Sequence, residues 1–229
     1  MKKYIWNGLF LFCMIVMLYS LSQIILKKME YRKAQMEYKE LTTETFQKEK
    51  IDFEALRNRN PDIVGWIKIP GTRIDYPVVC GKDNEEYLHK TFSKKQNRSG
   101  CIFLDVNCKK DFSSDNSVIY GHHMKDGSMF AELVKFRNPA FVKRHKRILL
   151  YLPEKTLSLS VVSAYAAAPK VLPIEFSSIR EKERWKAEIL KGSESVKGKI
   201  KGNVYTFVTC SYEKEDYRTY IHAVKTEGK

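Results

Sequence analysis

The sequence predicts a mainly β protein carried behind an N-terminal transmembrane helix. Three observations lead to this expectation: an uncharged run near the N-terminus, short apolar runs separated by turn residues after Pro61, and few helical patterns between those runs. The chain has 229 residues, which allows one ordinary domain with an appendage or at most two small domains. With 43% hydrophobic residues it can bury a core, which excludes global disorder. Its 11 Gly and 7 Pro exclude collagen-like and low-complexity classes.

The first predicted element is a membrane-spanning helix. Residues 5–26 form a run of 22 without a charged side chain, which is long enough to cross a bilayer. A cleaved signal peptide is the alternative, because a lysine pair precedes the run and Ser20 to Ser22 loosely resembles a cleavage site. The run continues beyond that point until a second lysine pair ends it, which favours an uncleaved anchor over residues 1–26. Since the lysine pairs balance, they do not predict the orientation of the helix.

Residues 27–50 form the next segment. They are rich in charge and contain no Gly or Pro, so they favour a helical stalk that lifts a domain off the membrane. A disordered juxtamembrane linker is the alternative. Asp52 is a suitable N-cap for a short helix that the Asn60-Pro61 pair would end. The folded domain is therefore expected over residues 51–229, with this helix as its lead-in.

After Pro61 the chain consists mainly of short apolar runs. Many of them are rich in β-branched and aromatic residues, which is typical of half-buried strands. Eight such runs with few helices between them predict a mostly antiparallel barrel or sandwich. The runs are 63–70, 75–79, 101–105, 117–121, 147–153, 157–165, 204–210 and 219–224.

Two helical insertions interrupt these strands. Residues 128–136 carry an apolar stripe at helical spacing. Residues 177–191 begin with Ser178 and Glu181, the pattern of a capping box. The apolar edge of this second helix is predicted to comprise Ile179, Trp185 and Ile189.

The chain is strongly basic. It has 41 Lys and Arg against 27 Asp and Glu, a formal net charge of +14. Nucleic acid, an anionic membrane surface and another polyanion such as a cell wall are all compatible partners. Charge alone does not choose among them.

The five cysteines do not form a disulfide framework, because their number is odd and their positions are scattered. They also lack the CxxC or Cys/His spacing of a zinc site. Cys80, Cys101 and Cys108 are expected to be small buried hydrophobic residues. A Cys101–Cys108 disulfide is a minor alternative, if the domain faces an oxidising space.

Cys210 differs from the other cysteines because it ends a predicted strand, VYTFVTC, just before a polar loop. A thiol at a strand end can be held rigidly and still be reached by a substrate, as a nucleophile requires. Taken alone, a cysteine in such a position is more often structural.

Arg218 lies eight residues further on, where the next apolar run begins. If the two strands pair as a hairpin, its guanidinium returns beside Cys210 and could stabilise a developing oxyanion. The alternative is a solvated loop arginine that pairs with an acidic neighbour. Those neighbours are Glu213, Glu215 and Asp216.

A cysteine nucleophile also needs a proton acceptor, and His122 is the candidate. It follows another predicted strand and Gly121, so it too lies at a strand end. The adjacent His123 raises the question of a metal site, but neighbouring residues point to opposite sides and no third ligand is evident, so no metal is expected. The other histidines are expected to be at the surface (His89 and His145) or structural (His222).

These motifs together resemble a class B sortase, a membrane-anchored cysteine transpeptidase of Gram-positive bacteria. The resemblance rests on YGHHM at 120–124, TFVTC at 206–210 and Arg218, preceded by NPDIVGWIKIPGTRIDYPVV. The family signature is a strand ending TLxTC, a Gly-His after an earlier strand and a downstream Arg. Phe207 stands where Leu is usual, a conservative apolar change. The resemblance spans roughly residues 50–225, and the helical lead-in and the long helix before the Cys strand favour class B over class A.

The resemblance implies an eight-stranded β-barrel with peripheral helices, anchored with its N-terminus inside and its catalytic domain outside the cell. It implies that Cys210 is the nucleophile, His122 the general acid/base and Arg218 the group that stabilises the oxyanion or positions the substrate. Thr209 matches the motif threonine that helps to line the site. No cofactor is implied.

The implied reaction cuts a C-terminal sorting signal, NPxTx or LPxTG-like, in a secreted protein through a thioacyl intermediate. The acceptor would be a peptidoglycan-precursor or pilin amine. Two alternatives remain: a secreted Cys/His peptidase that releases its product to water, and a non-catalytic basic module that binds the wall. Nucleic acid is not an expected partner, since no recognition module is present and the domain would face outward.

Overall fold

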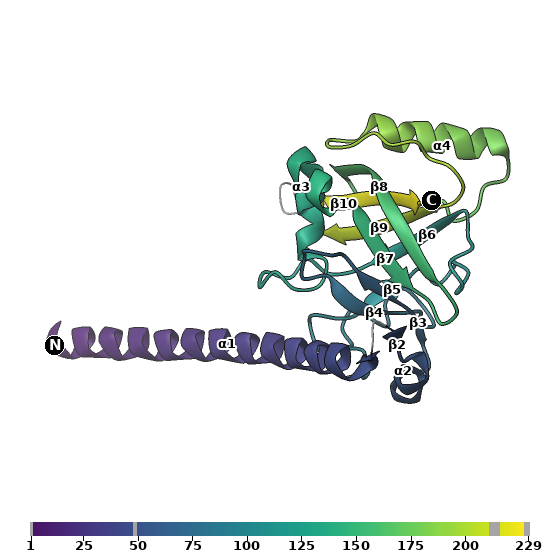
Figure 1. Cartoon of the computed structure of the whole chain (residues 1–229). Helices are drawn as coiled ribbons and strands as arrows, with labels where there is room; N and C mark the ends of the chain where they lie inside the picture. Colours follow the sequence, from purple (N-terminus) through teal and green to yellow (C-terminus); the bar gives the residue numbers. More distant parts are fainter. Residues whose placement is uncertain (1, 48–49, 211–215, 227–229) are drawn as a thin grey trace.

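The computed structural model describes residues 2–47, 50–210 and 216–226 (Figure 1). Eight strands close into a barrel in the order β10-β8-β7-β3-β4-β5-β6-β9, so the predicted eight-stranded barrel with helices around it is confirmed. Each of the eight predicted apolar runs overlaps one barrel strand. The strands are β3 (Ile63–Lys68), β4 (Asp75–Val79), β5 (Ile102–Leu104), β6 (Asn116–Tyr120), β7 (Arg147–Tyr151), β8 (Thr156–Ala167), β9 (Val204–Cys210) and β10 (Arg218–Lys225).

The barrel is mostly but not entirely antiparallel. β4 pairs with β5, and β6 with β9, in parallel, whereas the other six neighbouring pairs of the described barrel are antiparallel. The β6–β9 pair decides where the site forms. Because two parallel strands end at the same edge of a sheet, the residues after β6 and the last residue of β9 meet at one edge of the barrel.

Several barrel strands are buried on both faces, which explains their continuous apolar runs. In β9 every residue from Val204 to Thr209 is buried and only Cys210 is exposed. Phe207 packs inside against Phe130, with ring centroids 6.3 Å apart. On the neighbouring strand β10, the ring of His222 meets Trp185 of α4 (Ile179–Lys191) edge-on, with centroids 5.7 Å apart.

The helices around the barrel differ in detail from the sequence prediction. The lead-in α2 (Phe53–Arg59) begins as predicted, with the Asp52 carboxylate accepting from the Ala55 amide at 2.9 Å. The expected helix over 128–136 is instead a 3₁₀ helix, η1 (Ala131–Arg137). The short helix α3 (Pro139–His145) follows it, capped by Asn138 with Pro139 in its first turn.

The start and the apolar edge of α4 also need correction. Ser178 caps the helix by accepting from the Glu181 amide, but the Glu181 carboxylate accepts from Ser177 rather than from Ser178. Ile179 is 82% exposed, whereas Trp185 and Ile189 are buried. Six positions separate Ile179 from Trp185, which places the two about 120° apart around the helix.

The N-terminal helix α1 (Lys2–Thr45) is continuous. Its apolar part projects from the barrel (Figure 1) and is long and apolar enough to cross a membrane. From Glu30 onward the helix packs against the barrel, burying Ala34, Tyr38 and Leu41. A two-stranded hairpin, β1 (Phe46–Gln47) and β2 (Lys50–Ile51), joins it to α2. The second half of α1 is therefore helical and packed on the folded domain.

Candidate active site

Cys210 and Arg218 lie side by side at one edge of the barrel. Cys210 is the last residue of β9, Arg218 is the first of β10, and the antiparallel register pairs them directly. Both residues are exposed. The hairpin predicted from the sequence is therefore present. Of the acidic residues considered as alternative partners of Arg218, Glu213 and Glu215 lie outside the described residues.

The parallel pairing of β6 with β9 brings His122 to the same edge. Tyr120 pairs with Val208, and the Gly121 amide extends the ladder by donating to the Val208 carbonyl at 3.1 Å. His122 and Cys210 each follow the Tyr120–Val208 pair by two residues. His122, Cys210 and Arg218 line one open pocket of about 310 Å³. The pocket is completed by Asn84, Leu88, Phe103, Tyr120, Gly121, Val208 and Thr209.

A hydrogen bond to the main chain orients the His122 ring. Its Nε2 lies 2.7 Å from the Leu88 carbonyl oxygen. Because a carbonyl only accepts, Nε2 carries the hydrogen, and Nδ1 is the nitrogen that can accept a proton in the neutral ring. Burial lowers the pKa of His122 below its usual value of 6.5, and the Leu88 carbonyl opposes that shift because it favours the protonated ring. The exposed His89 ring stacks on His122 with a centroid separation of 6.0 Å.

His123 has a different environment from its neighbour. Its Nδ1 lies 3.0 Å from the Cys210 carbonyl oxygen, to which it donates. It also forms an isolated antiparallel bridge with Met129. The ring of His123 is therefore tied to the main chain at the end of β9, while that of His122 is tied to Leu88.

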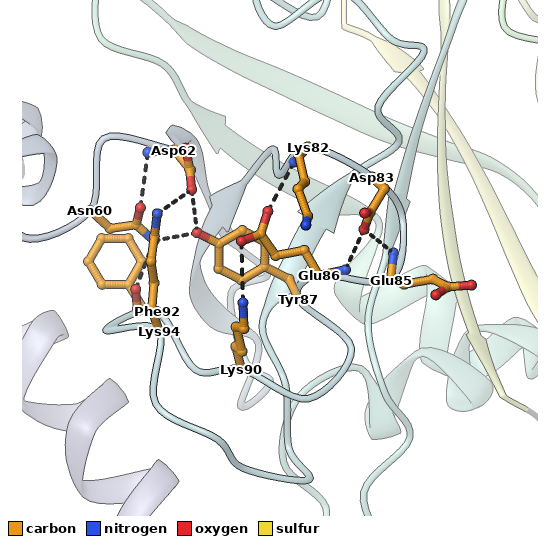
Figure 2. A network of polar contacts seen from close by, with 10 residues as sticks. All are labelled: Asn60, Asp62, Lys82, Asp83, Glu85, Glu86, Tyr87, Lys90, Phe92 and Lys94. Atoms are coloured by element: carbon orange, nitrogen blue, oxygen red, sulfur yellow. Dashed lines mark hydrogen bonds and ion pairs between the residues drawn. The ribbon is translucent and has the colours of Figure 1, made fainter.

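The wall that supplies Leu88 and Asn84 is the connection between β4 and β5, residues 80–101. A polar network holds this connection (Figure 2). The buried Asn60 amide donates to the Tyr87 hydroxyl and to the Phe92 carbonyl, both at 2.8 Å. The Tyr87 hydroxyl in turn donates to the Asp62 carboxylate at 2.7 Å, which also pairs with Lys94 at 2.8 Å. The Asn60 amide, the Tyr87 hydroxyl and the Asp62 carboxylate therefore all form hydrogen bonds within the network. A buried polar network stabilises a fold when its groups are satisfied in this way.

The same connection is braced a second time at its start. The Asp83 carboxylate accepts from the amides of Glu85 and Glu86, at 3.0 and 2.8 Å. The Glu86 carboxylate accepts from the Lys82 amide at 3.0 Å and pairs with Lys90 at 3.4 Å (Figure 2). Leu88, whose carbonyl meets His122, lies between Glu86 and Lys90 in this connection. Sequence reasoning did not identify Leu88, Asn84 or the residues of this network.

Thr209 is 2% exposed and lines the pocket next to Cys210. Its cross-strand neighbour on β10 is Thr219, which is also buried. Neither hydroxyl has a hydrogen-bond partner among the described residues. Both hydroxyl oxygens are shielded from solvent, and an unpaired buried hydroxyl costs free energy.

The three other cysteines of the folded domain and His222 are unsuited to this chemistry. Cys80, Cys101 and Cys108 are buried free thiols, and burial raises the pKa of Cys101 and of Cys108 to about 12. His222 is fully buried in β10 between Thr206 and Tyr165, and burial lowers its pKa to about 3. These residues are structural, as the sequence predicted.

A model of the sortase domain matches residues 67–226 of this chain. The chain belongs to the sortase family. Sortase B of Staphylococcus aureus (strain NCTC 8325 / PS 47) is 31% identical over 189 residues, which cover 80% of this chain and 78% of that protein. The class B resemblance is therefore confirmed, and the chain is a sortase B-like cysteine transpeptidase.

Solved sortase B structures share the fold. The sortase from B. anthracis in complex with AAEK1 is 30% identical with a TM-score of 0.78, over 86% of this chain and 99% of that one. A Staphylococcus aureus sortase B–substrate complex is 28% identical with a TM-score of 0.76, over 87% and 100%. A sortase B complexed with triglycine is 28% identical with a TM-score of 0.73, over 88% and 99%.

Proposed function

We propose that this sortase cuts a C-terminal sorting signal, NPxTx or LPxTG-like, in secreted proteins and joins the cut protein to a cell-wall amine. In this proposal Cys210 is the nucleophile, His122 the general acid/base, Arg218 the oxyanion or substrate-positioning group, and Thr209 a residue that helps to line the site. The observation that carries these roles is the meeting of the first three side chains in one pocket at the ends of β6 and β9 and the start of β10.

The first half-reaction forms a thioester. The Cys210 thiolate attacks the carbonyl carbon of the scissile peptide bond, and Arg218 donates to the oxygen on which negative charge develops. The carbon–nitrogen bond then breaks, and protonated His122 gives its proton to the leaving amine. The thioacyl enzyme retains the N-terminal part of the substrate, and His122 is left neutral.

The second half-reaction transfers the acyl group to an amine. The incoming amine attacks the thioester carbon while Nδ1 of neutral His122 takes its proton. The carbon–sulfur bond breaks, which restores the Cys210 thiolate and protonated His122. A peptidoglycan-precursor or pilin amine is the proposed acceptor, in line with the substrate and the triglycine held by the two sortase B complexes.

The proposed location is the cell membrane, with α1 crossing it once and the barrel outside the cell. Its support is the apolar first half of α1 together with the membrane anchoring that is typical of sortases. Secreted substrates and wall amines are found on that side.

The function is tested by incubating the full chain in detergent with NPxTx and LPxTG-like peptides, with and without triglycine. A transpeptidase is expected to give the ligated product when triglycine is present and slow hydrolysis when it is absent. If the same peptide is cut but triglycine never replaces water in the product, the chain is a Cys/His peptidase and the proposed transfer is wrong.

Exchange of Arg218 for lysine is expected to be damaging. Lysine keeps the charge but loses the planar five-donor fork. Losing directed hydrogen bonds to the oxyanion should cost about 2.7–4 kcal/mol of transition-state stabilisation, as for one oxyanion-hole donor, which is roughly a 10²-fold or larger fall in kcat/KM. The measurement is kcat/KM for ligation by Arg218→Lys and Arg218→Ala, with melting curves as the control for folding. Near-wild-type activity of Arg218→Lys would show that Arg218 takes no part in the reaction and only pairs with acidic neighbours. Such exposed ion pairs contribute only about 0–1 kcal/mol.

A further inference from the structure

The second half of α1 contacts the connection that forms one wall of the active site. The Glu30 and Glu37 carboxylates accept from the amides of Arg98 and Ser93, both at 2.9 Å. The Tyr38 hydroxyl donates to the Gly100 carbonyl at 2.5 Å. Tyr38 is only 4% exposed, so this hydrogen bond is shielded from water. The helix that leads out of the barrel therefore holds the chain just before β5.

Gly100 is the point where this contact reaches the active site. It adopts a φ of +60°, and a Cβ built on it would lie 2.6 Å from the Leu88 carbonyl oxygen and 3.1 Å from Cδ2 of His122. Its backbone is thus packed against both partners of the hydrogen bond that orients His122. The adjacent Cys101 amide donates to the Tyr87 carbonyl at 3.0 Å. This hydrogen bond joins the end of the connection to the segment that contains Leu88.

We propose that Tyr38 of α1 is a positioning residue for the transpeptidation reaction. Its hydroxyl holds the Gly100 turn against the Leu88 carbonyl, so that this carbonyl keeps His122 in the Nε2–H form with Nδ1 free to exchange protons with thiol and amine. The inference rests on the proposed acid/base role of His122. In this proposal the second half of α1 helps to position His122, in addition to connecting the membrane anchor to the barrel.

The ring and the hydroxyl of Tyr38 have separable roles. The ring fills the interface between helix and barrel and meets the Tyr76 ring edge-on, with centroids 5.3 Å apart. Phenylalanine keeps this packing and removes the hydroxyl, with its hydrogen bond to Gly100 and its contacts with the Cys101 thiol and the Phe92 backbone. Tyr38→Phe therefore separates positioning of His122 from attachment of α1 to the barrel.

The direction of the effect on His122 follows from its surroundings. The Leu88 carbonyl raises its pKa, while burial and the neighbouring His89 lower it. Among the described residues, Cys210, Arg218 and Tyr120 are the other titratable groups that line the pocket. When the Gly100 turn loosens, the contribution of Leu88 weakens and the pKa of His122 falls. The alkaline limb of the kcat/KM profile, where His122 must still be protonated to act as an acid, then moves to lower pH.

The test uses the full chain in detergent micelles, wild type and Tyr38→Phe, with ¹³C,¹⁵N-labelled histidine. The variant is expected to lower kcat/KM roughly three- to tenfold, as for one hydrogen bond, mainly through kcat. Its His122 resonance is expected to titrate at lower pH than in the wild type. Glu44→Gln is the matched control, because Glu44 pairs with Arg59 at 2.8 Å further along the same helix and not with the active-site wall. Glu37→Ala, which removes the acceptor of the Ser93 amide, should act in the same direction as Tyr38→Phe but less strongly.

Unchanged titration of His122 in Tyr38→Phe and Glu37→Ala, or an equal loss of activity in Glu44→Gln, would overturn the inference. The titration is read from the resonance and needs no turnover. It therefore separates failure of this inference from failure of the proposed function, which would appear as a wild-type chain that ligates no peptide.

Discussion

Replacing Cys210 by alanine is expected to abolish both peptide cleavage and ligation while leaving the fold intact. In the proposed mechanism the Cys210 thiol forms the covalent bond to the substrate. No neighbouring thiol can replace it, because Cys101 and Cys108 are buried and their pKa values are raised to about 12. The fold should survive because Cys210 is the exposed last residue of β9, where truncation leaves no cavity. The measurement is product formation with and without triglycine, alongside the melting temperature.

The matched control is Cys13→Ala, another exposed thiol but in the apolar half of α1. It is expected to retain wild-type activity. A folded Cys210→Ala protein that still cleaves the peptide would contradict the assignment of the nucleophile.

The two adjacent histidines are expected to differ sharply in their effect on the rate. His122→Ala should lower kcat/KM by roughly 10² or more, as for loss of a general acid/base. His123→Ala should retain most activity, because its ring donates to the Cys210 carbonyl and so supports the main chain at the end of β9. One such hydrogen bond is worth about 0.5–1.5 kcal/mol, which limits the loss to about tenfold. The measurement is kcat/KM for ligation across pH, with circular dichroism to show that both variants fold.

Each histidine variant controls for the other, because they lie on the same short connection between β6 and η1. The lost activity of His122→Ala should be accompanied by loss of the alkaline limb of the pH profile. If His123→Ala were the more damaging of two folded variants, the acid/base role would belong to His123.

The barrel strands and the hairpin of the site were predictable because their information is local. Apolar runs bounded by turn residues identified all eight strands, and the eight-residue separation of Cys210 and Arg218 predicted their pairing. The parallel pairing of β6 with β9 was not predictable in this way. It joins segments almost ninety residues apart in the chain, and nothing in either strand's own pattern specifies its partner.

The residues that orient His122 escaped sequence reasoning for the same physical reason. Leu88 acts through its main-chain carbonyl, so its residue type carries no signal of the contact. Asn60 and Tyr87 are polar residues of a kind found on any surface, and only the fold buries them together. The charged segment 27–50 likewise favoured a helix, but its contacts with residues 93–100 depend on where the barrel places that connection.

The central claim, that Cys210 carries the acyl group during transfer, is tested most directly by intact-protein and peptide mass spectrometry. The full chain is mixed with a sorting-signal peptide, quenched in acid and digested, while a parallel sample is chased with triglycine before the quench. We expect an adduct with the mass of the N-terminal peptide fragment on the peptide that contains Cys210, and we expect triglycine to remove it with an equal yield of ligated product. Cleavage without an adduct on Cys210, or an adduct that triglycine does not convert into ligated product, would contradict this account.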